Sequence, residues 1–209
     1  MKVTVFIFLL LITVSAVNGA PKAGNSTTRL IVAFGNSLTA GYGVALDEAY
    51  PSLLENRLRK EKFPYRVVNA GISGETTSGG LSRIDSVIRR KPDIVIVELG
   101  ANDGLRGTPV EIIQSNLGQM IKQLQKKKIK VLLAGMRLPP NYGTEYTDGF
   151  HRMYLDLAAK YKIPVIPFFL EGAAATEGLN QADGLHPTAE GYKLVVNHLW
   201  PYLVPLLSK

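Results

Sequence analysis

The sequence predicts an α/β fold, a three-layer α/β/α sandwich around a five-stranded parallel sheet in the flavodoxin-like order 2-1-3-4-5. Two observations support this prediction. Short apolar runs rich in β-branched residues alternate with longer stretches whose apolar residues recur at helical spacing. The short runs are almost continuously hydrophobic, which is typical of strands covered on both faces. Right-handed crossovers between five such runs build the sheet.

The elements follow from these patterns in chain order. Helical spacing appears first at Leu53, Leu54 and Leu58, and it is clearest between residues 112 and 124. A last helix is expected to begin at Pro187, because proline suits the first helical position and disfavours helix at the residue before it. The five expected strands are residues 30–34, 66–69, 94–99, 130–136 and 165–168.

The N-terminus is typical of a secretory signal peptide. Met1 and Lys2 precede an apolar run of 15 residues from Val3 to Val17, and small residues follow up to Ala20. This run is shorter than the roughly 20 residues that span a bilayer, although a retained anchor is the alternative. We therefore predict a signal peptide over 1–19, a flexible lead over 20–28 and one folded domain over 29–209. We expect the mature protein to be periplasmic or secreted.

The composition limits the chemistry and the partners. The chain has 46% hydrophobic and 20% charged residues, as a globular protein does, and it has no cysteine, which excludes disulfides and thiolate catalysis. Its net charge of +7 includes the clusters 89–91 and 126–128. Both fall where a helix should end, so they complement helix dipoles, and attraction to an anionic surface is the alternative. We predict a monomer that binds no nucleic acid and contacts a membrane surface only transiently.

A candidate nucleophile follows the first strand. Residues 35–43 read Gly-Asn-Ser-Leu-Thr-Ala-Gly-Tyr-Gly, so Ser37 lies on a tight turn with small residues beside it. Such a turn exposes the hydroxyl and lets a substrate approach the backbone. Alone, the pattern is more often an ordinary turn. It matches neither the Gly-x-Ser-x-Gly elbow of α/β-hydrolases nor the glycine spacing of a dinucleotide site.

A candidate base lies near the C-terminus, where residues 183–187 read Asp-Gly-Leu-His-Pro. Asp183 is three residues before His186 and can accept a hydrogen bond from its Nδ1 atom. That bond fixes the tautomer and leaves Nε2 facing a serine. The alternative is that both residues only cap the last helix.

Candidate oxyanion donors follow the second and third strands. Asn102 lies in the segment Gly-Ala-Asn-Asp-Gly after the third strand, and Gly74 lies in the glycine-rich segment 69–77 after the second. A side-chain amide and an unobstructed backbone N–H can both donate to an oxyanion, although each segment is also a turn signal. Glu98, within an apolar strand, is expected to hydrogen-bond a neighbouring loop.

With these four segments the chain resembles an SGNH (GDSL-type) hydrolase, a family named after the serine, glycine, asparagine and histidine of its four motifs. The resemblance runs from about residue 30 to the C-terminus, and it is strongest to the periplasmic thioesterase, lysophospholipase and arylesterase subgroup. It implies Ser37 as nucleophile, His186 as base and Asp183 as the residue that orients it. It also implies an oxyanion hole made by Ser37 N–H, Gly74 and Asn102, with no cofactor and no metal.

Two further features qualify the resemblance. Residues 137–143, Arg-Leu-Pro-Pro-Asn-Tyr-Gly, are similar to the loop that lines the acyl pocket of that subgroup, which implies Leu138 and Pro139 as acyl contacts. Packing of this segment on the core is the alternative.

The family usually has aspartate before the nucleophile, where this chain has Asn36. Asparagine keeps an acceptor oxygen and adds a donor, so the turn can survive while the rate and pH profile change.

The function predicted from these residues is serine-dependent hydrolysis of acyl esters through an acyl-enzyme. Coenzyme A thioesters are cytosolic, so lysophospholipids or short to medium acyl esters are the preferred substrates of an exported enzyme. A carbohydrate O-deacetylase and a non-catalytic binding module on the same fold are alternatives. A metal-dependent phosphoesterase would need clustered His and carboxylate ligands, and the chain has no such motif.

Overall fold

The computed structural model describes Met1 and residues 28–208. Apart from Met1 and Thr28, the expected signal peptide and lead lie outside the described residues. Within the part that is described, no helix has the length and apolar character needed to cross a membrane.

Five parallel strands form one sheet in the order β2-β1-β3-β4-β5, which is the predicted order. Their register places Gly35 of β1 beside Gly71 of β2 and beside Glu98 of β3. The carboxyl ends of these three strands therefore meet at the point where the strand order reverses, which is where open α/β sheets bind ligands. The strands are β1 (Arg29–Gly35), β2 (Tyr65–Gly71), β3 (Ile94–Glu98), β4 (Lys130–Ala134) and β5 (Val165–Ile166).

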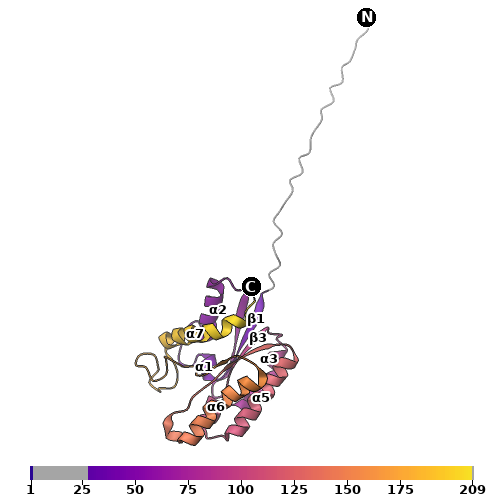
Figure 1. Ribbon diagram of the computed structural model, residues 1–209. Helices are drawn as coiled ribbons and strands as arrows, with labels where there is room; N and C mark the ends of the chain where they lie inside the picture. The colour runs from indigo at the N-terminus through magenta and orange to yellow at the C-terminus, as the bar shows by residue number, and fades with distance from the viewer. Residues whose placement is uncertain (2–27, 209) are drawn as a thin grey trace.

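Helices cover both faces of the sheet, which makes the three layers (Figure 1). The helices α2 and α7 pack together on one face, and α3, α5 and α6 pack side by side on the other. The longer helices are α2 (Tyr50–Lys60), α3 (Thr77–Ile88), α5 (Val110–Lys126), α6 (Thr144–Tyr161) and α7 (Ala189–Leu203). Short elements at the carboxyl edge and the C-terminus are α1 (Ser37–Ala40), α4 (Ala101–Leu105), η1 (Pro140–Tyr142) and η2 (Val204–Leu206).

Several expected boundaries differ from the observed ones, and the structure gives a physical reason for two of these differences. The last helix begins at Ala189 and not at Pro187, because the Thr188 side chain accepts a hydrogen bond from Gly191 N–H and caps it. Pro187 lies before the cap and pairs with Asn180 in an isolated antiparallel bridge. The fifth strand has only two residues because Pro167, which has no N–H to donate, follows it directly.

The central strands account for the stability of the sheet. Every residue of β3, including Glu98, is buried, and β1 is buried from Leu30 onward. Each large aliphatic side chain buried in such a core contributes about 1.5–3 kcal/mol. The loops at the carboxyl ends of β1 and β3 therefore follow strands that lie deep in the core.

Candidate active site

Ser37 is the first residue of the short helix α1, directly after β1. The Asn36 side chain caps this helix by accepting the N–H of Leu38 at 2.9 Å, and Gly41 ends it in a left-handed conformation with φ 84°. The N–H of a first helical residue has no partner within the helix, so the Ser37 N–H is available to a ligand. The glycine before the turn is required, since a Cβ at Gly35 would overlap the Glu98 carboxylate.

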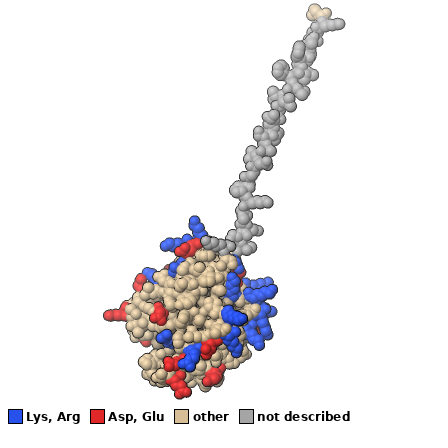
Figure 2. Space-filling view, viewed as in Figure 1, with Lys and Arg blue, Asp and Glu red and all other residues tan. Residues whose placement is uncertain are grey.

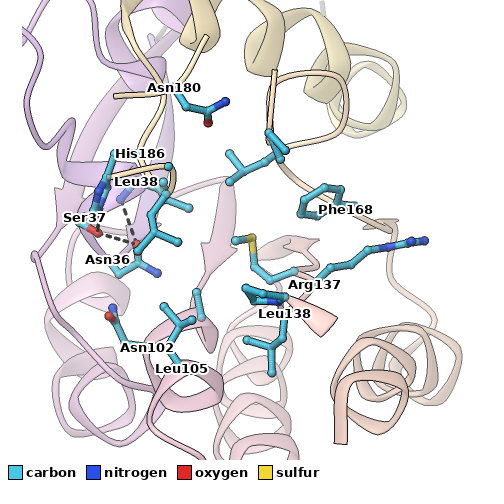
Figure 3. Close-up of a pocket in the computed structure, with 18 of the residues that line it drawn as sticks. Asn36, Ser37, Leu38, Asn102, Leu105, Arg137, Leu138, Phe168, Asn180 and His186 are labelled. Carbon is cyan, nitrogen blue, oxygen red and sulfur yellow. Dashed lines mark hydrogen bonds between the residues drawn. The ribbon is translucent and has the colours of Figure 1, made fainter. Parts of the chain in front are cut away.

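The structure brings Ser37, His186 and Asp183 into one hydrogen-bonded chain. Nε2 of His186 lies 2.8 Å from Ser37 Oγ, and Nδ1 lies 2.6 Å from Oδ2 of Asp183. A carboxylate only accepts hydrogen bonds, so Nδ1 donates to Asp183 and the lone pair of Nε2 faces the serine hydroxyl. Figure 3 shows Ser37 and His186 together on one wall of a pocket.

Asp183 is held as a carboxylate. Burial acts to raise its pKa, but hydrogen bonds from His186 N–H, Leu185 N–H and the imidazole outweigh burial and lower the pKa to about 2. Asp183 therefore stays ionised throughout the neutral and mildly acidic range. It can orient the imidazole and stabilise its positive charge without taking the proton itself.

Two residues that the sequence did not single out hold the histidine loop against the nucleophile loop. Gln181 Nε2 donates to the carbonyls of Tyr42 at 2.7 Å and Pro187 at 2.9 Å, and its backbone N–H donates to the His186 carbonyl. The Tyr42 ring packs on the imidazole with a centroid separation of 4.8 Å. Both contacts join segments about 140 positions apart, so no local pattern could reveal them.

The expected oxyanion donors follow β2 and β3: Gly74 lies in the loop after β2, and Asn102 lies in α4, which follows β3. The Asn102 amide donates to the Glu75 carbonyl at 3.0 Å, which uses one of its two N–H groups and leaves the second for a ligand. Gly74 has φ 78°, and its carbonyl accepts a hydrogen bond from Arg106 at 3.2 Å. Ser37 and Asn102 line the pocket, and Gly74 is not among its lining residues. An ion pair between Arg83 and Glu75, also unexpected from the sequence, holds the Gly74 loop.

Glu98 lies fully buried beneath the nucleophile turn and confirms the expected contact with a neighbouring loop. Its carboxylate accepts hydrogen bonds from Asn36 N–H at 3.2 Å, Asn36 Nδ2 at 2.8 Å and Thr39 Oγ1 at 2.8 Å. Burial raises the pKa of Glu98 from 4.5 to about 7, although these three donors act to lower it. Asn36 is thus matched to Glu98, because its amide places a donor where the usual aspartate would place a second carboxylate.

We expect Asn36→Asp to make stability depend more strongly on pH. A buried carboxyl whose folded-state pKa is raised stabilises the fold most below its unfolded pKa, and this stabilisation is lost as the pH rises through the folded value. For Glu98 the window runs from about pH 4.5 to about pH 7, and the loss is about 3 kcal/mol. In the variant, a second carboxyl group at position 36 must share one proton with Glu98, which raises the pKa of the pair further.

The measurement is urea unfolding of both proteins from pH 5 to pH 9. We expect Asn36→Asp to match the original protein near pH 5 and to lose about 2 kcal/mol more by pH 8. Asn141→Asp, at an exposed position, provides the matched control and should follow the original protein throughout. Parallel curves for Asn36→Asp and the original protein would show that the two carboxyl groups do not interact.

The pocket beside Ser37 is a cavity of about 380 Å³ with mainly apolar walls. Leu138 and Pro139 both line it, and Leu138 lies opposite Ser37 and Asn102 (Figure 3). The packing alternative for this segment holds only in part, since Leu138 is half-buried and Pro139 is exposed. Other apolar lining residues are Leu105, Met136, Phe168, Leu170 and Leu185.

The other two histidines lie outside this site. His151 belongs to α6 and His198 to α7, and a ring nitrogen of each is buried without a hydrogen-bond partner. Neither lines the pocket. Within residues 28–208, no three His, Cys, Asp or Glu side chains are grouped so that they could hold a metal ion.

Comparison with known proteins places the chain among hydrolases. Residues 33–194 match the model of the GDSL-like lipase/acylhydrolase family. Esterase TesA of Pseudomonas aeruginosa is 42% identical over 183 residues, which cover 87% of this chain and 91% of that protein. Thioesterase 1/protease 1/lysophospholipase L1 of Escherichia coli is 34% identical over 204 residues, covering 97% and 92% of the two chains.

Solved structures agree with this comparison. A crystal structure of TesA superposes with a TM-score of 0.83 at 42% identity and covers 86% of this chain and all of its own. The esterase EstA from Pseudoalteromonas sp., solved in a form inhibited by monoethylphosphonate, gives 0.81 at 32% identity, with 85% and 97% covered. The residues that match the family model include both Ser37 and His186. The chain therefore belongs to the GDSL-like lipase/acylhydrolase family.

Proposed function

We propose that this protein is an exported serine esterase that hydrolyses acyl esters through an acyl-enzyme on Ser37. The observation that carries the proposal is the hydrogen-bonded chain from Asp183 through His186 to Ser37, which opens onto an apolar cavity. Membership of a family whose relatives include an esterase, an arylesterase and a thioesterase/lysophospholipase supports it. The signal-peptide pattern of the first 19 residues supports export.

The chemistry follows from the orientation of the imidazole. Ser37 Oγ attacks the ester carbonyl carbon while Nε2 of His186 takes the hydroxyl proton, and the carbonyl oxygen becomes an oxyanion. Collapse of this intermediate breaks the ester C–O bond, and His186 returns the proton to the leaving alcohol. Water then attacks the acyl-enzyme with the same base, which releases the acid and restores Ser37.

We assign the oxyanion to three donors, the Ser37 N–H, the Gly74 N–H and the free N–H of Asn102. Asn102→Ala should lower turnover of a chromogenic ester about 100- to 1000-fold, because one donor to the developing charge is lost. Asn116→Ala is the matched control, since the Asn116 amide also tethers a neighbouring loop, through Thr77, but lies outside the cavity. If both variants turn over equally well, Asn102 is not an oxyanion donor.

The apolar cavity favours an acyl chain as the bound part of the substrate, with Leu138 and Pro139 as contacts. Lysophospholipids and short to medium acyl esters fit this chemistry. Each buried methylene contributes about 0.8 kcal/mol, so kcat/KM should rise about fourfold per methylene until the cavity is full. The experiment compares p-nitrophenyl esters from acetyl to palmitoyl.

The chain-length profile distinguishes the activities on this fold. A rise from acetyl toward longer chains, followed by a plateau, supports an acyl-chain esterase. A maximum at acetyl would instead indicate a deacetylase. No hydrolysis of any ester, together with no labelling by a fluorophosphonate, would indicate a binding module.

A further inference from the structure

The charges of this protein are segregated along the strand direction. Four connections lead from a helix into a strand, and they span residues 59–64, 88–93, 126–130 and 160–164. Together they hold twelve Lys or Arg and only two acidic residues. The rest of the described chain holds nine Lys or Arg against fifteen acidic residues.

All four connections lie at one edge of the molecule. They precede β2, β3, β4 and β5, and in a parallel sheet the amino ends of the strands share an edge. Figure 2 shows Lys and Arg side chains gathered on this side, where α3 ends, and acidic side chains mainly elsewhere. We call this surface the basic edge. The serine and histidine lie at the opposite, carboxyl edge.

Most of these cations are free to meet an external anion. Among the described residues, none of Arg89, Arg90, Lys91, Lys127 and Lys128 forms an ion pair or a side-chain hydrogen bond, and all five are exposed. A cation stabilises a helix through the helix dipole only when it lies within the last turn, and this effect fades beyond that turn. Most of the cations in these connections follow the last helical residue, so the dipole explains few of them.

The backbone supplies a second observation. Each connection has one lysine at positive φ, namely Lys62 at 60°, Lys91 at 52°, Lys128 at 59° and Lys162 at 52°. A residue with a side chain loses about 1 kcal/mol of folding free energy when it adopts a left-handed conformation, and glycine does not. Glycine would be more stable at each of these four equivalent positions, yet each position has a lysine and its positive charge.

We propose that the basic edge binds the anionic lipid headgroups of a membrane surface. Positive charge without acidic partners complements such a surface. Each Lys or Arg near an anionic membrane raises the affinity of the protein for that membrane about fivefold. A membrane docked here leaves the carboxyl edge and its serine facing away from the lipid.

The test uses the protein as a bacterial expression host processes it. It measures binding of this protein to phosphatidylcholine vesicles with and without phosphatidylglycerol. We expect binding to rise with phosphatidylglycerol and to be lost near 1 M salt, where charges are screened within about 3 Å. The double variant Lys127→Gln, Lys128→Gly should lower partitioning onto anionic vesicles roughly 20-fold. Glycine at 128 removes the charge and suits the positive φ.

The matched control removes the same net charge elsewhere. Arg152→Gln with Lys193→Gln changes two exposed residues away from the basic edge and should leave partitioning nearly unchanged. Both double variants should hydrolyse a soluble p-nitrophenyl ester as the original protein does, which shows that they are folded. Equal binding to both vesicle types, or equal losses in the two double variants, overturns the proposal. Binding to a polyanion such as heparin but not to anionic vesicles overturns it as well.

Discussion

Replacing Ser37 by alanine is expected to lower ester turnover about 10⁶-fold and to abolish labelling by a fluorophosphonate. The hydroxyl lies 2.8 Å from Nε2 of His186 and at the mouth of the apolar cavity. Without it no acyl-enzyme forms, and only the weak catalysis by the oxyanion donors on attacking water remains. Because the side chain is only partly buried, the variant should fold normally.

The measurement combines steady-state hydrolysis of p-nitrophenyl esters with mass spectrometry of the labelled protein. Ser82→Ala is the matched control, because its hydroxyl makes a single hydrogen bond to Gly79 on α3, outside the pocket. Labelling should appear on Ser37 in the original protein and in the control. Residual turnover of Ser37→Ala within tenfold of the original protein would assign the reaction to another nucleophile.

The sequence predicts the layers and the strand order because hydrophobic periodicity reports which residues are covered on both faces. Buried runs such as β1 and β3 indicated the strands, and the flavodoxin-like order that we expected for five such units is the order observed. Helix and strand ends were less accurate, since they depend on local competition for hydrogen bonds. Thr188 outcompeted Pro187 as the start of α7 for that reason.

The residues of the site were predictable where the chemistry is local in sequence. Asp183 and His186 are three residues apart, and Ser37 and Asn102 each follow a strand directly. The supporting contacts were not predictable, because they join segments that meet only after folding. Gln181 holds Tyr42, and Asn36 donates to Glu98, across long stretches of chain. Glu98 was noticed only because a carboxylate within an apolar strand must find a partner.

Asp183→Asn is expected to lower turnover about 10⁴-fold with little change in substrate binding. In the original protein, Asp183 Oδ1 accepts hydrogen bonds from the backbone N–H groups of Leu185 at 2.9 Å and His186 at 3.0 Å. The side-chain oxygen of asparagine can accept the same two bonds. Its amide nitrogen then faces Nδ1 of His186 as a donor in place of Oδ2. The imidazole must accept there, so its proton moves to Nε2 and points at the serine hydroxyl, which can no longer lose its own proton to the base.

Comparing kcat with thermal stability separates this tautomer effect from a loss of folding. Hydrogen bonding lowers the Asp183 pKa to about 2, so its stabilising contribution is present above about pH 4 and is lost as the pH falls toward 2. At pH 7 the substitution removes this contribution, but the Asp183 side chain is 37% exposed, which keeps the contribution small, so kcat should fall far more than thermal stability. Glu190→Gln, which only breaks an exposed ion pair with Lys193, should lose neither. If Asp183→Asn kept its turnover, the imidazole would not depend on Asp183 for its orientation, and Tyr42 and Gln181 alone would have to hold it.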